Sequence, residues 1–592
     1  MLQNTALIAY VPGAYVHQLV KNIREGILAC GEIAVEELDL TVCCPEDAAA
    51  RSRDAGLLVL ATPEVNLKAA KQTYDLALSV KYGSREGRLA ALAFSAVDDA
   101  CDTDALKYLL SLAGYELHSP DLFVRSEPDG VMLDYAFEYG FNLGCRLRRI
   151  PNTRKPLMMK CLVCGEIFDA SLGICPVCGA GLEQCVPVNE EETSFHKNSD
   201  STYLILGAGI AGISAAEAIR KRDETGKIIL LSDEPELPVN RPLLSKEDPK
   251  KSRPEALPIH DAGWYAERGL ELRLNCRAEK INSAEKTVTV SGKAVHYDKL
   301  IYALGAESFV PPIKGTDKKN VFTLRHKSDL DALELASGSA KTAVVIGGGA
   351  IGLEAAGKLT RSGIKVTVLE AAGQIMERQV DRDSADRVIA AMNSFGCSCY
   401  EGVKIEEICG EDTASSVKIS DGRSFPADLV LLSCGVKASA ALAAEGGIAT
   451  ERGVTVNRRM ETNIPDVYSC GDCAELEHIN LQLWTEASLQ GTIAGANAAG
   501  DSVMYPLPLL GMGQEFFGTS FYAIGDSGAK PLENYKTVII EDTVTRAREL
   551  YRFYADELRG AVLINRQEKT AEVCSAVTER RLYSEMFGKD SR

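Results

Sequence analysis

Residues 202–234 read TYLILGAGIAGISAAEAIRKRDETGKIILLSDE, and the architecture of the central part of the chain can be inferred from them. An apolar run enters a turn with Gly207, Gly209 and Gly212, continues into an Ala-rich segment, and returns as a second apolar run that ends at Glu234. This order predicts a strand, a turn, a helix and a second strand. The first glycine permits the tight turn, the second admits a diphosphate close to the backbone, and the third lets the helix pack on the strand.

The same pattern occurs again at residues 342–370, TAVVIGGGAIGLEAAGKLTRSGIKVTVLE. Gly347, Gly349 and Gly352 take the three glycine positions, and Glu370 follows the second apolar run. A single glycine-rich turn is a weak signal because such turns are common, whereas two in one chain are a strong signal. We therefore expect an α/β fold with two Rossmann-type domains, each binding a diphosphate at a helix N-terminus.

The acidic residue after each second strand bears on the identity of the nucleotide. A carboxylate there accepts hydrogen bonds from ribose hydroxyls, and in the first unit we expect Glu234, in preference to Asp233, to do so. Glu370 would accept from the 2′-hydroxyl of NADH and would repel the 2′-phosphate of NADPH. No Arg or Lys follows Glu370 before Arg378, so the sequence favours NADH over NADPH.

A third motif distinguishes the two dinucleotide sites. Residues 462–472, TNIPDVYSCGD, resemble the second flavin motif of the pyridine-nucleotide-dependent FAD reductases. In that family the order along the chain is FAD fold, NAD fold and then this motif. The resemblance implies that Gly471 and Asp472 complete the first fold and that Asp472 holds the ribityl chain of FAD. The implied ligands are FAD in the first fold and NADH in the second.

Two further segments resemble the rubredoxin and ferredoxin reductase branch of this family. Residues 238–246, PVNRPLLSK, match its PYxRPxLSK loop, which implies that Arg241 and Lys246 lie along the flavin; a solvated loop with two cations is the alternative. Glu354 matches the acidic residue of the GGGxIGxE motif, which implies a place beside the nicotinamide; a charge on a helix face is the alternative. Glu354 and Lys246 are thus the candidate catalytic residues. The segment implied to run beneath the flavin ring contains Trp484, Ala487, Gln490 and Gly491.

Thiol chemistry on the substrate is not expected. Disulfide reductases of this fold carry a CxxxxC motif, and peroxide or coenzyme A disulfide reductases carry one Cys in the loop at 238–246; the sequence has neither. Cys470 and Cys473 flank Asp472 with the spacing of a redox dithiol. The family has small residues at these positions, which implies that both thiols are structural.

Four cysteines indicate a metal site near residue 170. They form two CxxCG knuckles, Cys161 with Cys164 and Cys175 with Cys178. Each knuckle directs two thiolates toward one point, and four thiolates in a tetrahedron suit either iron or zinc. The segment resembles a short rubredoxin domain, which implies a single Fe. Glu166 stands where rubredoxins carry an aromatic residue and the spacer is short, so a zinc ribbon stays open. Cys185 lies outside the pattern and is expected to be an ordinary thiol.

The first 150 residues alternate apolar runs with amphipathic segments, which predicts a doubly wound parallel sheet. Strands are expected at 6–10, 33–40, 56–61 and 89–94, all buried, and helices at 15–29, 66–79, 104–113 and 132–149. The size and rhythm resemble a flavodoxin. The first loop, VPGAYV at 11–16, lacks the Ser and Thr hydroxyls that hold the FMN phosphate in flavodoxins. We therefore expect a domain without FMN that serves in docking or dimerisation.

Composition limits the partners of the chain. Its 592 residues are 46% hydrophobic and 25% charged, as in soluble multidomain proteins. A net charge of −18 argues against nucleic acid or an anionic membrane as a partner. We find no apolar run long enough to span a membrane and no secretory signal. The 18 scattered cysteines fit a reducing, cytoplasmic location better than a disulfide framework.

The motifs divide the chain into domains. They are a flavodoxin-like domain at 1–150, a rubredoxin-like metal domain with the four knuckle cysteines at 155–188, a flexible linker at 189–201, an FAD-binding domain at 202–316 and 435–505, an NAD-binding domain at 317–434, and a C-terminal domain at 506–592. In the resembling reductases the last domain covers the flavin or forms an interface, such as that of a homodimer.

Taken together, the chain resembles the NADH:rubredoxin oxidoreductases. The resemblance implies that electrons pass from NADH through FAD to an iron centre held by four thiolates, and from there to a one-electron carrier protein or a small acceptor. Two alternatives stay open. One is an NADH oxidase or diaphorase in which a zinc ribbon is structural. The other is an FAD-binding redox sensor or scaffold.

Overall fold

The computed structural model describes residues 4–13, 15–63, 71–80, 88–95, 104–118, 122–124, 128, 130–150, 157–162, 167–173, 175, 180–188, 196–246, 257–506, 511–528, 534–542 and 544–588. The chain divides into two compact units. The first comprises Met1–Asn189 with Gln567–Val573, and the second comprises Glu190–Arg566 with Cys574–Arg592.

The first unit contains a parallel sheet in the order β2-β1-β3-β4-β5, with β6 also on β4. Alternate residues of each strand point to opposite faces. Ala6 and Ile8 pack with α1 and α5, whereas Leu7 and Ala9 pack with α2, α3 and α4. The elements are β1 (Thr5–Tyr10), α1 (Val16–Ala29), β2 (Ala34–Asp39), α2 (Pro45–Ser52), β3 (Leu57–Thr62), α3 (Lys71–Val80), β4 (Arg88–Ser95), α4 (Asp104–Leu112), β5 (Tyr115–Leu117), β6 (Leu122–Val124) and α5 (Gly130–Arg148). The described part of this domain is thus a parallel sheet with helices on both faces.

One predicted strand differs in its burial. The sequence predicts a buried strand at 33–40, but three of the six residues of β2 are exposed and only Leu38 is buried. The reason is its position, because β2 is an edge strand and pairs only with β1 among the described residues. In contrast, β3 lies inside the sheet and is buried along its whole length. The predicted helix at 66–79 is seen from Lys71, since residues 64–70 lie outside the described ranges.

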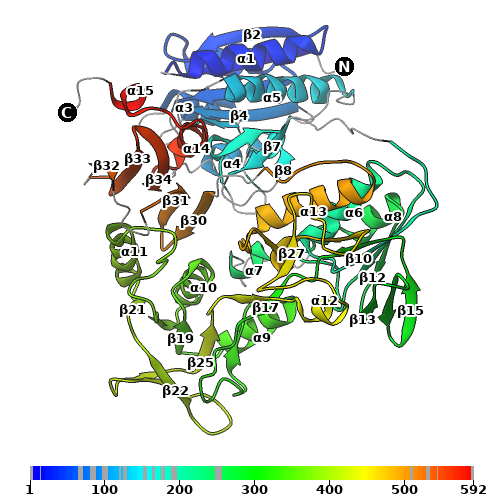
Figure 1. The fold of residues 1–592 in the computed structure, drawn as a ribbon. Helices are drawn as coiled ribbons and strands as arrows, with labels where there is room; N and C mark the ends of the chain where they lie inside the picture. Colours follow the sequence, from blue (N-terminus) through cyan, green and yellow to red (C-terminus); the bar gives the residue numbers. More distant parts are fainter. Residues whose placement is uncertain are drawn as a thin grey trace. The chain divides into compact units, whose positions relative to one another are not determined.

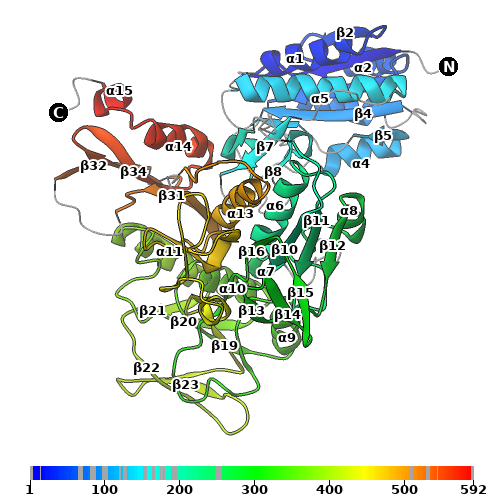
Figure 2. The ribbon, with the colours of Figure 1, turned by 45° about the vertical axis from the view of Figure 1, so that its right-hand side comes forward.

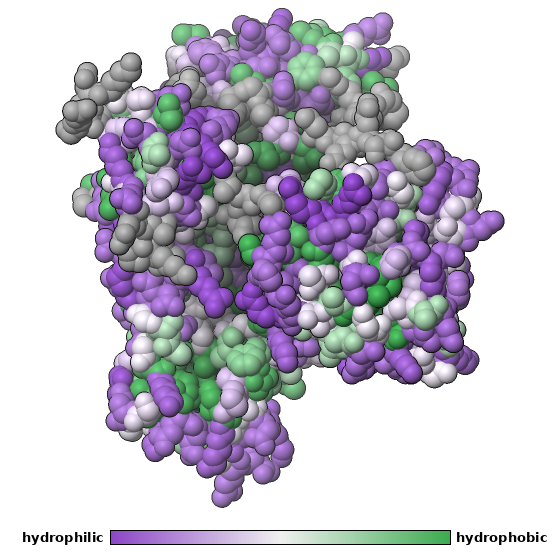
Figure 3. Space-filling model, in the orientation of Figure 1, coloured by the Kyte–Doolittle hydropathy of each residue, from purple (hydrophilic) through white to green (hydrophobic). Residues whose placement is uncertain are grey.

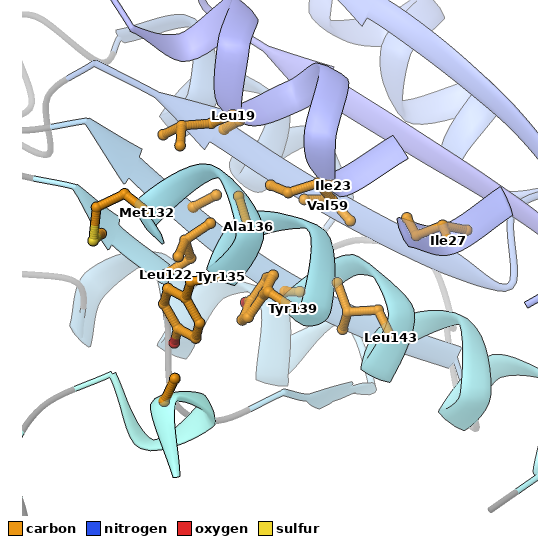
Figure 4. Packing of buried hydrophobic residues seen from close by; sticks show 14 of the residues in the cluster. Leu19, Ile23, Ile27, Val59, Leu122, Met132, Tyr135, Ala136, Tyr139 and Leu143 are labelled. Carbon is orange, nitrogen blue, oxygen red and sulfur yellow. The ribbon is translucent and has the colours of Figure 1, made fainter. Parts of the chain in front are cut away.

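Helices α1 and α5 pack closely because glycines line their contact. A Cβ atom at Gly26 would lie 2.0 Å from the carbonyl O of Phe137, and one at Gly140 would lie 2.1 Å from that of Ile23. Figure 4 shows buried residues of this cluster from both helices, among them Leu19, Ile23 and Ile27 on α1 and Ala136, Tyr139 and Leu143 on α5.

The cysteine-rich segment of the first unit forms a small antiparallel sheet in the order β8-β7-β9. Its elements are β7 (Met158–Cys161), β8 (Ile167–Asp169), η1 (Ala170–Leu172), η2 (Leu182–Gln184) and β9 (Cys185–Pro187). Met159 and Phe168 are buried in the same hydrophobic cluster as residues of α5. The small sheet therefore packs on the N-terminal domain.

The first Rossmann-type domain has a parallel sheet in the order β12-β11-β10-β16-β28. Tyr203 and Ile205 face α6 and α13, while Leu204 and Leu206 face a three-stranded sheet, β13-β14-β15. Figures 1 and 2 show α6 and α13 side by side. The elements are β10 (Thr202–Leu206), α6 (Ile210–Arg220), β11 (Lys227–Leu231), α7 (Pro242–Lys246), α8 (Ala262–Glu267), β12 (Leu270–Arg273), β13 (Ala278–Asn282), β14 (Thr287–Val290), β15 (Lys293–His296), β16 (Lys299–Tyr302), α12 (Ala441–Glu445), β27 (Val454–Val456), β28 (Val467–Ser469), η4 (Gly471–Cys473), β29 (Ala474–Leu476) and α13 (Trp484–Ala498).

The second Rossmann-type domain repeats this arrangement, with the order β18-β25-β19-β20-β21. Ala343 and Val345 face α10 and α11, while Val344 and Ile346 face the sheet β22-β23-β24. A ribbon of two strands, β17 and β26, connects the two domains. The elements are β17 (Ala306–Ser308), β18 (Val321–Phe322), α9 (Lys327–Ser337), β19 (Thr342–Ile346), α10 (Ala350–Arg361), β20 (Lys365–Leu369), α11 (Arg382–Ser394), β21 (Ser398–Tyr400), β22 (Ile405–Cys409), β23 (Ser416–Ile419), β24 (Ser424–Pro426), β25 (Leu429–Leu432) and β26 (Val436–Ala438).

The C-terminal region is an antiparallel sheet in the order β30-β31-β34-β33-β32. Phe516 and Phe521 share a hydrophobic cluster with Leu353 of α10 and Met392 of α11, so the sheet packs on the second Rossmann-type domain. That it covers the flavin or forms a dimer interface stays a prediction. The elements are β30 (Gly511–Phe516), β31 (Thr519–Gly525), β32 (Tyr535–Asp542), β33 (Ala547–Tyr554), β34 (Glu557–Ile564), η5 (Gln567–Lys569), α14 (Thr570–Thr578) and α15 (Tyr583–Phe587).

The helices and the surface bear on whether the chain contacts a membrane. No helix within the described ranges is both long enough and apolar enough to span a bilayer. On the face drawn in Figure 3, hydrophilic side chains predominate and hydrophobic ones form smaller groups between them.

Candidate functional site

The first glycines of the two turns occupy the same backbone conformation. Gly207 has φ +100° and Gly347 has φ +112°, a region that residues with a Cβ rarely adopt. A Cβ atom would lie 2.2 Å from the carbonyl O of Ala303 at the first position and 2.1 Å from that of Ser433 at the second. Neither turn can accommodate a larger residue here.

The other glycines of the turns divide into two kinds. A Cβ atom at Gly212 or Gly352 would lie 2.0 Å or 2.2 Å from the carbonyl O of the first glycine in its own turn, so these positions bring helix and strand together. At Gly209 and Gly349, no atom of a described residue lies within 4 Å of such a Cβ. Both are N-caps without a side-chain cap, so the N–H groups of α6 and α10 face open space that suits a diphosphate.

Glu370 lies directly after β20, as predicted. Its Oε2 accepts a hydrogen bond from the N–H of Gly348 at 2.5 Å, and its Oε1 accepts one from the N–H of Ala372 at 2.6 Å. The carboxylate is therefore oriented by neutral backbone donors beside the second glycine turn.

In the first domain, Glu234 does not occupy the position that corresponds to Glu370. Strand pairing aligns Leu206 with Leu231, as it aligns Ile346 with Leu369, so the residue equivalent to Glu370 is Ser232. Glu234 lies two residues farther along the chain.

The carboxylate of Glu234 is ion-paired with two cations. Arg241 Nη2 lies 2.8 Å from Glu234 Oε1, and His326 Nδ1 lies 3.3 Å from the same oxygen. The hydrogen bond with His326, followed by the charge of Arg241, lowers the pKa of Glu234. Binding of the ribose by Glu234 stays a prediction.

Asp472 is brought to the first turn of α6. Its preceding residue, Gly471, has φ +78°, and a Cβ there would lie 2.8 Å from the Cβ of Ala211. The Gly471 N–H donates to Gln490 Oε1 at 2.9 Å, which holds the loop against α13. Asp472 Oδ2 accepts a hydrogen bond from Arg325 Nη2 at 2.8 Å. The motif at 462–472 thus lies against the first turn of α6. That Asp472 holds the ribityl chain of FAD stays a prediction.

These donors fit FAD in the first domain. The open N-terminus of α6 and the guanidinium groups of Arg241 and Arg325 present positive charge for a diphosphate. Asp472 supplies an acceptor for ribityl hydroxyls in the same place. Arg241 is partly buried, with 24% of its side chain exposed, and the loss of solvent lowers its pKa. A partly buried guanidinium is stabilised by anions near it.

Glu354 connects the two Rossmann-type domains. It lies in α10 with 9% of its surface exposed, and its Oε2 accepts a hydrogen bond from the hydroxyl of Ser245 in α7. A solvated charge on a helix face would not be so buried, which favours the role implied by the GGGxIGxE motif. The backbone of Lys246 belongs to α7, but its side chain lies outside the described part of the chain. The assignment of Lys246 stays a prediction.

The thiols beside Asp472 do not have the environment of a redox dithiol. Cys470 and Cys473 are completely buried. Burial raises the pKa of Cys473 to about 11 and raises that of Cys470 well above its ordinary value. The thiolate is the reactive form, so burial disfavours thiol chemistry at both residues near neutral pH.

Half of the predicted metal-binding set is described. Cys161 ends β7 and Cys175 begins the second knuckle, and both are 1% exposed. Cys164 and Cys178 lie outside the described residues. Cys185 is opposite Cys161 in the β7–β9 pair, and its thiol donates to the carbonyl O of Gly181 at 3.4 Å. That contact agrees with an ordinary thiol outside the metal site.

A second group of potential ligands lies near β29. Ligand atoms of Glu451, Glu475 and His478 come within 4.8 Å of one another. Arg452 already approaches them, because its Nε lies 3.5 Å from Glu475 Oε1 and its guanidinium donates to the carbonyl O of His478. The arginine supplies the positive charge, so we do not interpret this group as a metal site.

Arg325, His326 and Glu307 were not among the residues predicted for the site. Arg325 meets Asp472 only through a tertiary contact. The same holds for His326, which meets both Glu234 and Glu307. Arg325 and His326 come from the segment before α9, and Glu307 comes from β17, far in sequence from both glycine turns. The only local signal was charge in the connection between the two Rossmann-type domains, and charge alone does not identify a partner.

Comparisons with known proteins support this arrangement. The family model described as pyridine nucleotide-disulphide oxidoreductase matches residues 201–491. The chain is 34% identical over 274 residues to the ferredoxin–NAD(+) reductase component of the biphenyl dioxygenase system of Paraburkholderia xenovorans, covering 46% of this chain and 67% of that protein. It is 32% identical over 364 residues to a nitrite reductase [NAD(P)H] of Bacillus subtilis, covering 61% of this chain but only 45% of that protein.

Among solved structures, the NADH:rubredoxin oxidoreductase of Clostridium acetobutylicum matches with a TM-score of 0.54 and 25% identity. The match covers 67% of this chain and 98% of that one. The family model spans both glycine turns and the motif at 462–472.

Proposed function

The chain belongs to the pyridine nucleotide-disulphide oxidoreductase family and is an NAD(P)H-dependent oxidoreductase, and we propose that it passes electrons from NADH through FAD to a rubredoxin-type iron centre with four thiolate ligands. A one-electron carrier protein or small molecule would take the electrons from that centre. The main observation behind the flavin assignment is the meeting of Asp472, Arg325 and the first turn of α6.

In this proposal the residues of the chain bind and orient FAD and NADH. FAD, when bound, accepts a hydride from NADH and can release electrons singly. Arg241 and Arg325 neutralise the diphosphate, and Asp472 accepts from the ribityl hydroxyls. Glu370, held by two backbone N–H groups, receives the 2′-hydroxyl of NADH. Glu354, held by Ser245, lies at the junction where nicotinamide and flavin would meet.

The metal part of the proposal is supported by sequence spacing and by the small sheet. Two CxxCG knuckles supply four soft thiolates, the donor set for iron or zinc. Cys161 and Cys175 are buried in the small domain with the three-stranded antiparallel sheet. A one-electron iron site beside a two-electron flavin would convert hydride transfer to single-electron transfer.

We also propose that the N-terminal domain is flavodoxin-like but lacks FMN. Its strand order, 2-1-3-4-5, is the order of flavodoxin-like sheets. A Cβ at Gly13 in the first loop would lie 2.5 Å from the Cβ of Pro63, so Pro63 packs directly against this loop. The Ser and Thr hydroxyls that could hold a phosphate are missing from the sequence of that loop. Docking or self-association is the function we assign to it.

A metal assay combined with a visible spectrum tests the electron route. Full-length protein should contain one iron per chain with the absorption of ferric thiolate, and NADH should bleach both the flavin and the iron bands under anaerobic conditions. Cys161→Ser and Cys175→Ser should lose the iron and keep the flavin. Cys185→Ser is the matched control, because this buried cysteine lies on the same sheet outside the knuckles, and it should keep both.

Two results would replace the proposal. Zinc in place of iron, with rapid oxidation of the reduced flavin by oxygen, would indicate an NADH oxidase or diaphorase with a structural ribbon. Slow reoxidation by every one-electron carrier tried would indicate a redox sensor. Stopped-flow reduction with NADH followed by mixing with carriers distinguishes the two.

A further inference from the structure

His326 lies between two carboxylates from different segments of the second unit. It directly precedes α9, and its side chain is 30% exposed. Its Nδ1 lies 3.3 Å from Glu234 Oε1, and its Nε2 lies 3.3 Å from Glu307 Oε2. Both ring nitrogens can donate only when the ring is protonated, so this geometry fits an imidazolium.

The two carboxylates belong to parts of the fold with different tasks. Glu234 follows β11 in the loop that approaches the first dinucleotide turn. Glu307 is the middle residue of β17, which pairs with β26 in the ribbon between the two Rossmann-type domains. His326 therefore connects the first nucleotide loop to the connecting ribbon.

The same short segment also holds the other partner of Glu234. Arg241 Nη2 lies 2.8 Å from Glu234 Oε1, and Arg241 Nη1 donates to the carbonyl O of Arg325 at 3.2 Å. Lys327 Nζ lies 3.9 Å from Glu236 Oε2 in the same loop. Three consecutive residues, 325–327, thus fix the position of the loop from which Glu234 and Arg241 project.

We propose that His326 is a positioning residue for the flavin site: as an imidazolium it holds Glu234, and through Glu234 the guanidinium of Arg241, in the orientation that receives the adenosine ribose and diphosphate of FAD. The inference rests on the proposed function, because it assumes that FAD occupies the first domain. His326 itself need not touch the cofactor. Its contribution is to prevent Glu234 and Arg241 from turning toward solvent before FAD binds.

The charge of His326 makes this contribution dependent on pH. The charged groups that face it or adjoin it are Glu234, Arg241, Glu307, Arg325, Lys327 and Asp329. The hydrogen bonds with Glu234 and then Glu307 raise the pKa of His326 from 6.5 to about 9. A raised pKa means that the stabilising effect is complete below 6.5 and is lost as the pH rises through about 9. FAD should therefore bind more weakly in alkaline solution.

The test measures FAD affinity of the deflavinated full-length chain by flavin fluorescence between about pH 6 and about pH 10. His326→Gln should weaken binding roughly tenfold at about pH 6, the effect of one charge-assisted hydrogen bond, and should remove most of the alkaline dependence. His326→Arg keeps a charge that does not titrate, so it should restore affinity and flatten the profile. His196→Gln is the matched control, because His196 pairs with Glu224 on the surface at 2.8 Å and should change nothing.

A second variant, Glu307→Gln, should shift the pH dependence of FAD binding, which would not happen if His326 only stabilised the fold. Glu307→Gln leaves His326 and Glu234 in place but removes one of the carboxylates that raise the pKa of His326. The midpoint of the alkaline loss of FAD affinity should then move to lower pH. This measurement also tests the positioning role if His326→Gln is too unstable to purify.

The outcomes separate this inference from the proposed function. If the wild-type chain binds no FAD at any pH, the proposed function fails. If the wild-type chain binds FAD while His326→Gln matches it in affinity and pH profile, or while Glu307→Gln leaves the midpoint unchanged, the positioning role is overturned and the flavin assignment stands.

Discussion

The two Rossmann-type domains have the same backbone at their glycine turns but different charges around them. Gly207 and Gly347 both have positive φ, and Gly212 and Gly352 both leave no room for a Cβ. In the first domain, Arg241, Arg325 and His326 surround Glu234 and Asp472. In the second, Glu370 is held by two neutral backbone N–H groups.

This difference suggests how one fold takes on two tasks. Cations that are already held in place suit a cofactor that is bound tightly and stays bound, because they lower the free-energy cost of binding its diphosphate. A carboxylate held by neutral donors suits a substrate that must bind and leave in each turnover. The comparison therefore agrees with FAD in the first domain and exchangeable NADH in the second.

The largest effects should come from closing either turn. Gly212→Val would place a side chain against the carbonyl O of Gly207 and should lower FAD affinity about 100-fold or more. Gly352→Val should instead abolish reduction by NADH and leave the bound FAD in place. Flavin content and NADH-dependent bleaching measure the two effects separately. Loss of FAD from both variants would contradict the assignment of the domains.

Closing the helix contact behind the first turn should have the next largest effect. A Cβ at Gly491 of α13 would lie 2.1 Å from the carbonyl O of Ala211 in α6, so Gly491→Ala should lower the free energy of unfolding by about 2–3 kcal/mol. Gly357→Ala in α10 is the matched control, because its nearest neighbours lie at 3.5 Å and beyond. Denaturant unfolding of both variants measures the difference. Equal stability would mean that α6 and α13 do not pack this closely.

Removing the charge of Glu370 should have a moderate effect. Glu370→Gln should lower kcat/KM for NADH roughly tenfold, because one charged acceptor for the ribose is lost. The preference for NADH over NADPH should fall with it, since the repulsion of the 2′-phosphate is removed. Asp421→Asn, in a surface turn of the same domain, should leave both quantities unchanged. A variant that still rejects NADPH would show that another residue sets the specificity.

The smallest effect should come from the thiols beside Asp472. Cys470→Ala and Cys473→Ala should each change NADH-dependent flavin reduction by less than about threefold, because neither thiol takes part in the chemistry. Alkylation should support this. Burial raises the pKa of Cys473 to about 11, so the thiol should resist a thiolate-specific reagent near neutral pH, while the exposed Cys44 reacts. Inactivation that follows modification of Cys473 would contradict an inert role.

Much of the fold could be predicted because its signals are local. Gly207 and Gly347 are glycines since a positive φ and a nearby carbonyl O exclude other residues, and that requirement is visible in the sequence. The burial of β2 was predicted wrongly. Its sequence, AVEELD, has three acidic residues, as an edge strand can, whereas the central strand β3 reads LLVLAT. The ion pairs of Glu234 were not predicted. Arg241 is only seven residues away in the sequence, but His326 comes from a distant segment that only the tertiary structure brings to Glu234.

The sequence alone determined the two glycine turns and the elements around them, because glycine spacing and apolar periodicity act over a few residues. Only the tertiary structure decided that Arg325 meets Asp472, that His326 lies between Glu234 and Glu307, and that the C-terminal sheet packs on α10 and α11. Ion pairs and packing between distant segments depend on how whole elements come together, and a charge in the sequence does not specify which opposite charge it will reach.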